Sequence, residues 1–165
     1  EGTRKPSSDT PAILHIFRER PDINAVIHTH QPYATAVSLI PGLTEFRGCI
    51  TALANAAGGN VPITPYSAAG SIDMGIDTVK YVGNGHAVIL SQHGVMTVGK
   101  DLNQALYAAV YLEEAAKCYL AARAACVNGE IKQMSDAQIQ QMVDVFQYYG
   151  QGTAKIPEDL VKRID

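Results

Sequence analysis

The sequence predicts an α/β domain, and two observations support this. Short apolar runs with strand character, such as Ala87-Val88-Ile89-Leu90, alternate along the chain with longer segments of helical periodicity. The 165 residues, 47% of them hydrophobic and 18% charged, are enough for one core, and neither a repeat nor a linker divides them. We therefore expect residues 1–165 to form a single domain. Because the chain begins at Glu1 without a methionine, we also expect an N-terminal portion to be missing.

The first 42 residues predict two helices around one strand. Ser8 or Asp9 can cap a helix that carries an apolar stripe and that Pro21 stops. A strand covers about 25–28. A short helix follows over 32–40, ended by a Pro-Gly pair.

The middle of the chain is predicted from turn residues and short apolar runs. Over 43–65, Thr, Ile, Val and Pro alternate around a run of small residues, which predicts short strands joined by loops. A helix over 71–82 ends at a Gly-Asn-Gly turn. Residues 86–92 predict a strand, and 94–98 either continue it or form its hairpin partner.

Two further helices complete the chain. Asp101 can cap a long helix that reaches about Val127, where Asn-Gly stops it. Alanine on most of its faces predicts close packing on several sides. A last helix is predicted over 135–150, followed by a polar tail.

Charge and hydropathy exclude some classes of partner. The net charge of -3 gives no reason to expect nucleic acid or an anionic membrane. No apolar run approaches the roughly 18 residues that indicate a membrane span, and no signal peptide is visible. We expect a cytoplasmic protein with a small-molecule substrate.

The pattern that best indicates chemistry is the pair His28-Thr29-His30 at the end of a predicted strand. Side chains two residues apart in a strand point to the same face, so both rings project to one side. His93 follows another apolar run and is followed at once by Gly94. Three histidines from two strand ends, with a coordination position left open, are typical of a catalytic zinc site. For His28 and His30 alone, a hydrogen-bonded surface pair is the alternative.

Other polar residues have a structural and a functional interpretation. Asp9 can be a helix cap. Ser7 and Ser8 can be loop residues, or they can bind an anion together with the free N–H groups at a helix start. Tyr148 and Tyr149 can be an aromatic helix end that packs against the domain.

Several motifs, in this order, resemble the class II aldolase/adducin family from Glu1 to about Gln151. They are Pro6-Ser7-Ser8-Asp9-Thr10-Pro11, Arg20-Pro21-Asp22, Ala25-Val26-Ile27-His28-Thr29-His30, Gln92-His93-Gly94-Val95 and Tyr148-Tyr149-Gly150-Gln151. The resemblance implies an α/β fold with a central, mostly antiparallel sheet flanked by helices. It also implies a homotetramer with active sites between subunits.

The resemblance assigns roles to individual positions. His28, His30 and His93 match zinc ligands, although another divalent metal is possible, and Asp9 matches an acid/base residue at the metal. Ser7 and Ser8 match part of a phosphate site, and Tyr149 matches a tyrosine that handles a proton.

The implied function is a zinc-dependent aldolase. It would cleave a phosphorylated ketose resembling L-fuculose-1-phosphate into dihydroxyacetone phosphate and an aldehyde. L-Ribulose-5-phosphate 4-epimerase is the alternative, but Asn55 stands where the epimerase has an aspartate. A dehydratase or decarboxylase acting on a sugar acid phosphate, or a non-catalytic adducin-like assembly module, are further alternatives.

Overall fold

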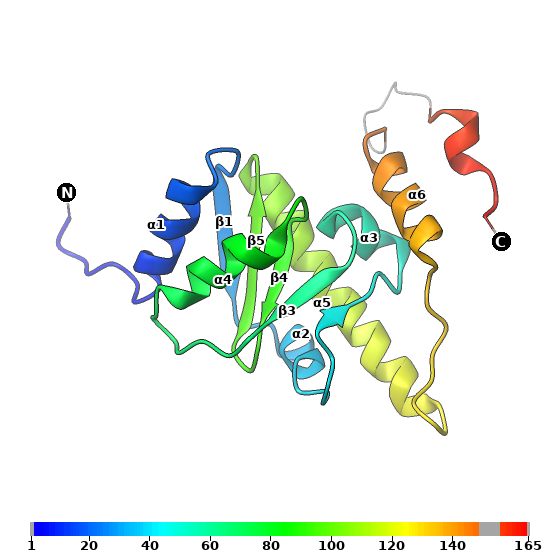
Figure 1. Ribbon diagram of the computed structural model, residues 1–165, viewed down its shortest axis with the longest axis horizontal. Coiled ribbons are helices and arrows are strands. Elements are labelled where there is room, and N and C mark those ends of the chain that lie inside the picture. The colour runs from blue at the N-terminus through cyan, green and yellow to red at the C-terminus, as the bar shows by residue number, and fades with distance from the viewer. Residues whose placement is uncertain (1, 149–155, 165) are drawn as a thin grey trace.

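The computed structural model describes residues 2–148 and 156–164 and contains a five-stranded sheet covered by helices on both faces (Figure 1). Its strands are β1 (Ala25–Thr29), β2 (Glu45–Phe46), β3 (Val61–Thr64), β4 (Ala87–Leu90) and β5 (Gly94–Gly99). Its helices are α1 (Thr10–Glu19), α2 (Pro32–Val37), α3 (Thr51–Ala57), α4 (Asp73–Val82), α5 (Leu102–Ala125) and α6 (Asp136–Phe146), with a short 3₁₀ helix, η1 (Glu158–Val161). The α/β fold with a mostly antiparallel sheet is therefore confirmed.

The strand order is β1-β5-β4-β3-β2. β4 and β5 form an antiparallel hairpin with Leu90 opposite Gly94, so the second apolar run is a hairpin partner of the first. β1 pairs antiparallel with the other edge of β5, while β3 runs parallel to β4. This topology brings the end of β1 beside the turn between β4 and β5.

Successive side chains along the β4–β5 hairpin point to opposite faces of the sheet, so the core consists of two clusters. Ala87 and Ile89 point to the cluster beneath α2, α3 and α5, whereas Val88 and Leu90 point to the cluster beneath α1 and α4. Figure 1 shows α1 and α4 in front of the sheet and α5 behind it. Helices on both faces explain why β4 and β5 are buried along their whole length.

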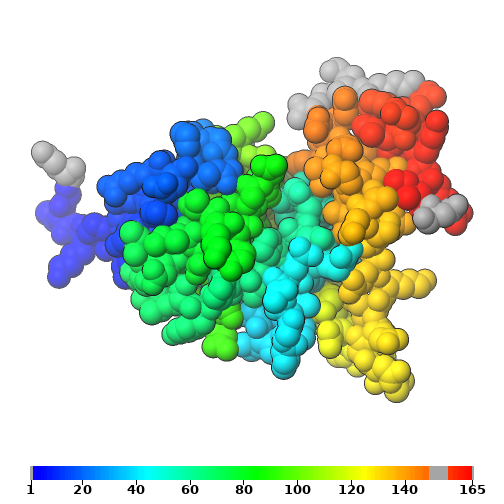
Figure 2. All heavy atoms as spheres, in the orientation of Figure 1, coloured from blue at the N-terminus to red at the C-terminus, as the bar shows by residue number. Residues whose placement is uncertain are grey.

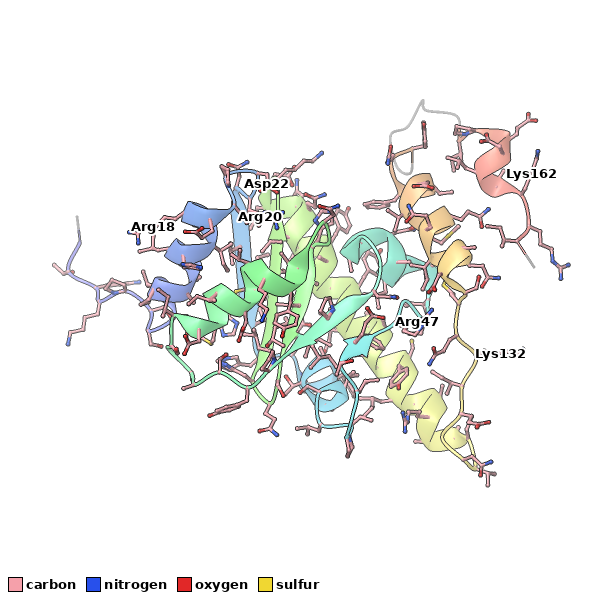
Figure 3. All side chains as sticks on the ribbon, viewed as in Figure 1. Arg18, Arg20, Asp22, Arg47, Lys132 and Lys162 are labelled. Carbon is pink, nitrogen blue, oxygen red and sulfur yellow. The ribbon has the colours of Figure 1, made fainter. Side chains whose placement is uncertain are left out.

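α1 and α4 pack against each other at very short range. A Cβ atom on Gly75 would lie 2.3 Å from the carbonyl oxygen of Ala12, so only glycine permits this approach. At the end of α1, the Arg20 guanidinium donates to both carboxylate oxygens of Asp22 and to the Gly83 carbonyl, which joins the ends of the two helices. The hydrogen bonds from Arg20 lower the pKa of the Asp22 carboxyl to about 2. Figure 3 labels both residues beside the upper part of β1.

α5 crosses the back of the sheet. Its buried face consists mainly of alanine, which allows the helix to approach α2, α3 and the strands closely. Asp101 caps it, as the sequence predicts, by accepting the N–H of Gln104 at 2.8 Å. Its outer face carries large exposed apolar side chains, namely Leu102, Leu106, Tyr107, Val110 and Tyr111.

The prediction for 43–65 was wrong in one part. The run of small residues forms α3, which buries Leu53 and three alanines, although the short strands β2 and β3 flank it as expected. The helix ends at Gly58, whose φ of +75° closes it with a left-handed residue. Two helices also end earlier than expected: α2 at Val37 and α6 at Phe146.

The two ends of the described chain project from the body. Figure 2 shows the N-terminal segment on one side and α6 with η1 on the other. α6 packs on α3, and its capping box at Ser135 and Gln138 is complete. None of the described helices is both long enough and apolar enough to span a membrane.

Candidate metal centre

The three candidate histidines meet at one edge of the sheet. His28 lies in β1, His30 directly after it, and His93 in the turn that leads into β5. Thr29 pairs with Val95 in the antiparallel register of β1 and β5, so the chain that leaves β1 meets the chain that enters β5. In Figure 1, this edge lies where β1 runs into α2.

The geometry of the three rings suits a shared cation. Their centroids are 4.9–5.0 Å apart, and a ligand nitrogen of each ring lies within 4.8 Å of the others. The Nε2 atoms of His30 and His93 are 3.1 Å apart. Two nitrogens on one tetrahedral zinc lie roughly 3.3 Å apart, because each Zn–N bond is about 2.0–2.1 Å.

His28 is oriented by its backbone environment. Its Nδ1 atom lies 2.9 Å from the Val95 carbonyl and can donate its proton there. Its Nε2 atom is buried and has no hydrogen-bond partner among the described residues. A ligating imidazole typically donates its other N–H to such an acceptor, so the unpartnered Nε2 atom fits a metal ligand.

His93 is kept neutral by its surroundings. Burial lowers its pKa, and the nearby His28 and His30 lower it further, while Asp9 acts in the opposite direction. Only a neutral imidazole offers a lone pair to a metal, so the ring can bind one at neutral pH.

Gly94 allows His93 and His30 to come together. A Cβ atom at this position would lie 2.5 Å from the Thr29 carbonyl oxygen and 3.2 Å from both Cα and Cδ2 of His30. The glycine that follows His93 in the sequence is therefore a steric requirement of the histidine cluster.

Asp9 precedes α1, but its side chain does not cap the helix. One carboxylate oxygen lies 4.0 Å from Nε2 of His28, and the side chain is 19% exposed. Ser7 donates its hydroxyl proton to the same oxygen at 3.1 Å and accepts the N–H of Asp9. The carboxylate therefore faces His28.

Ser7 and Ser8 line a hollow of about 610 Å³ at the start of α1. Two cationic side chains that the sequence analysis did not select, Lys5 and Arg18, line it too, and Figure 3 labels Arg18 on α1. Helical spacing could have identified Arg18, because it follows Leu14, which also lines the hollow, by one turn.

Tyr149 and Asn55, which the sequence also suggested, are not part of the cluster that the structure describes. Tyr149 falls outside the described residues. Asn55 lies on α3, which packs mainly on α5 and α6, and its buried side-chain oxygen has no hydrogen-bond partner among the described residues.

Comparison with known proteins identifies relatives of the chain. Residues 1–120 match the sequence model of the class II aldolase and adducin N-terminal domain. A 5-deoxy-D-ribulose 1-phosphate aldolase of Bacillus thuringiensis serovar kurstaki is 30% identical over 151 residues, which are 92% of this chain and 68% of that protein. A 3-oxo-tetronate 4-phosphate decarboxylase of Pectobacterium atrosepticum is 34% identical over 115 residues, which are 68% of this chain and 53% of that protein. The solved structure of an L-fuculose 1-phosphate aldolase superposes with a TM-score of 0.80 at 28% identity, covering 90% of this chain and 67% of the other.

Proposed function

Since this chain belongs to the class II aldolase and adducin family, we propose that it is a zinc-dependent aldolase. Its substrate would be a phosphorylated ketose such as L-fuculose-1-phosphate, and its products dihydroxyacetone phosphate and an aldehyde. The observation that carries the proposal is the cluster of His28, His30 and His93 beside a carboxylate that caps no helix. A scaffold would have no use for a complete set of metal-ligating side chains.

The three histidines, with Asp9 beside them, would hold the metal. A divalent ion at this position supplies Lewis-acid stabilisation of the negative charge that develops when a C–C bond next to a ketone breaks, a contribution of several kcal/mol. Zinc fits three imidazole ligands and an open position, and Co²⁺ or Ni²⁺ would accept the same donors.

Asp9 would transfer the proton. Its carboxylate lies 4.0 Å from Nε2 of His28, and the Ser7 hydroxyl donates a hydrogen bond to it. A carboxylate within reach of the carbon next to the ketone can take up and return the proton that replaces the broken bond. Tyr149 would orient and transfer the proton of the sugar hydroxyl whose oxygen becomes the aldehyde oxygen, because this proton leaves when the C–C bond breaks and returns in the reverse reaction.

Ser7 and Ser8 would contact the substrate phosphate. Their hollow also receives the cationic side chains of Lys5 and Arg18, and positive charge favours a phosphate. The N–H groups of Asp9 and Thr10 are bonded to Ser7 and Pro11 has none, so the start of α1 would add to this potential only through the helix dipole.

We further propose that the chain assembles into a homotetramer with active sites between subunits. The exposed apolar residues of α5 support this, because Leu102, Leu106 and Val110 follow one another at helical spacing. The rings of Tyr107 and Tyr111 stack on the same outer face, 6.2 Å apart and nearly parallel.

A product assay on purified protein with zinc tests the activity. We expect dihydroxyacetone phosphate from L-fuculose-1-phosphate or a related 1-phosphorylated ketose, and little interconversion of L-ribulose-5-phosphate and D-xylulose-5-phosphate. Epimerisation needs a second acid/base group, and the amide of Asn55 does not titrate in the useful range. Efficient interconversion would favour the epimerase.

A decarboxylase is the second candidate, because one relative carries that name. Release of carbon dioxide from a 3-oxo sugar acid phosphate, without aldol cleavage of any ketose phosphate, would replace the aldolase proposal. A protein that binds no metal and turns over none of these substrates would favour the assembly module.

A further inference from the structure

The segment that follows His30 is anchored on α5. Gln31, the next residue, donates its side-chain N–H to the Ala109 carbonyl at 2.8 Å. The N–H groups of Tyr33 and Ala34, at the start of α2, donate to the two carboxylate oxygens of Glu113 at 3.1 and 2.9 Å. Glu113 therefore caps α2 from another helix and fixes where the chain goes after His30.

The other end of α2 is bonded to the turn that carries His93. The Ser38 hydroxyl donates to the Thr35 carbonyl at 2.6 Å and accepts the N–H of Gln92 at 3.0 Å. Gln92 has a φ of +59° and is the only residue other than glycine with a positive φ in the described part of the chain. This conformation is disfavoured for glutamine and persists only where its surroundings impose it.

Gln92 directly precedes His93, so its backbone conformation sets the direction in which the imidazole projects. Its side chain is exposed and contributes nothing to the core. The Ser38 hydrogen bond is therefore a restraint on a strained turn beside a candidate ligand.

We propose that α2 and the hydrogen bonds at its two ends hold the metal centre in place. Ser38 is a positioning residue for His93, and Glu113 is a positioning residue for the segment after His30. This inference rests on the proposed metal site. These hydrogen bonds connect the histidine cluster to α5 without involving the side chain of any of the three histidines. Groups that orient metal ligands typically change metal affinity by about 10–100-fold when removed.

The test is the Zn²⁺ affinity of the purified chain, measured by competition with a chromogenic chelator. Ser38→Ala should weaken binding about 10–100-fold, and Ser38→Thr, which keeps the hydroxyl, should restore most of it. Ser135→Ala is the matched control. The hydroxyl of this serine also accepts a backbone N–H, that of Gln138 at 3.2 Å, but it lies at the start of α6. This variant should leave zinc affinity unchanged.

A spectroscopic measurement separates positioning from general stability. With Co²⁺ in place of zinc, the visible absorption bands of Ser38→Ala should shift relative to the wild type, while those of Ser135→Ala should not. Zinc affinity and Co²⁺ bands equal to the wild type in Ser38→Ala would overturn the inference.

Glu113→Gln provides a second variant if Ser38→Ala does not fold. The amide can accept only one of the two N–H groups, so zinc affinity should fall about tenfold, and an unchanged affinity would overturn the inference. A wild-type protein that binds no metal would instead refute the proposed function, so the two failures are distinguishable.

Discussion

Asp9 stands before a helix without capping it, which leaves its carboxylate available for chemistry. The Asp9→Asn variant keeps the size of the side chain and an oxygen that can accept the Ser7 proton. Because no cap is lost, we expect an unchanged melting temperature together with a loss of aldol cleavage of about 100-fold or more.

Steady-state kinetics of Asp9→Asn and Asp101→Asn test this assignment. Asp101 is a true cap, on α5, and its variant should retain normal turnover. Near-normal turnover by Asp9→Asn would return Asp9 to a structural role.

Gly94 offers a second test at single-residue scale. In Gly94→Ala, the new methyl group would meet the Thr29 carbonyl and displace His30. We expect the variant to lose zinc on dialysis under conditions where the wild type retains it. Equal zinc retention in the two proteins would show that the cluster tolerates this displacement.

Single residues were predictable where spacing alone determines geometry. The i, i+2 rule placed His28 and His30 together. The close approach at Gly94 is visible only in the structure, because it depends on how β1 and β5 pair. Lys5 was not predictable in the same way, because a surface cation in a loop carries no pattern of its own, whereas Arg18 lies one helical turn after Leu14. The positive φ of Gln92 accompanies a hydrogen bond that its N–H donates to the Ser38 hydroxyl, 54 residues earlier in the chain, which no local pattern predicts.

At the scale of elements, the packing of α1 on α4 positions Asp9. In Gly75→Ala, the added methyl group cannot avoid the Ala12 backbone. Better helix propensity would return only about 1 kcal/mol, less than the cost of the clash, so we expect a net destabilisation on the order of 2 kcal/mol. This corresponds to a melting temperature lower by about 4–8 °C, measurable by calorimetry.

Gly2→Ala is the matched control for this substitution. Its Cβ atom would meet nothing within 4 Å, so the melting temperature should not change. A Gly75→Ala protein as stable as the wild type would mean that the two helices can separate without cost.

Helices with an N-cap residue and a stripe of apolar side chains could be predicted from the sequence, whereas α3 could not. Its buried residues follow helical spacing and alanine favours a helix, but seven residues are too few for a helix that is stable by itself. Burial against α5 and α6 decides its structure, and this contact is tertiary.

At the scale of the whole molecule, the outer face of α5 predicts assembly. Leu106 is 50% exposed in the middle of the apolar face. Leu106→Glu should leave the fold intact but shift a tetramer toward monomers in light scattering, because a charge at a buried interface is costly.

Val127→Glu serves as the control for assembly. Val127 is a fully exposed residue just beyond the end of α5, so this variant should remain a tetramer. A wild-type protein that is monomeric at micromolar concentration would contradict the prediction.

The most direct test of the whole account is the metal content of the purified chain by elemental analysis, in the wild type and in His28→Ala. We predict about one divalent ion per chain in the wild type, mainly zinc, and almost none in the variant, with unchanged circular dichroism. His15→Ala, a histidine on α1 outside the cluster, should keep its metal. Full zinc occupancy in folded His28→Ala would contradict the assignment of the site.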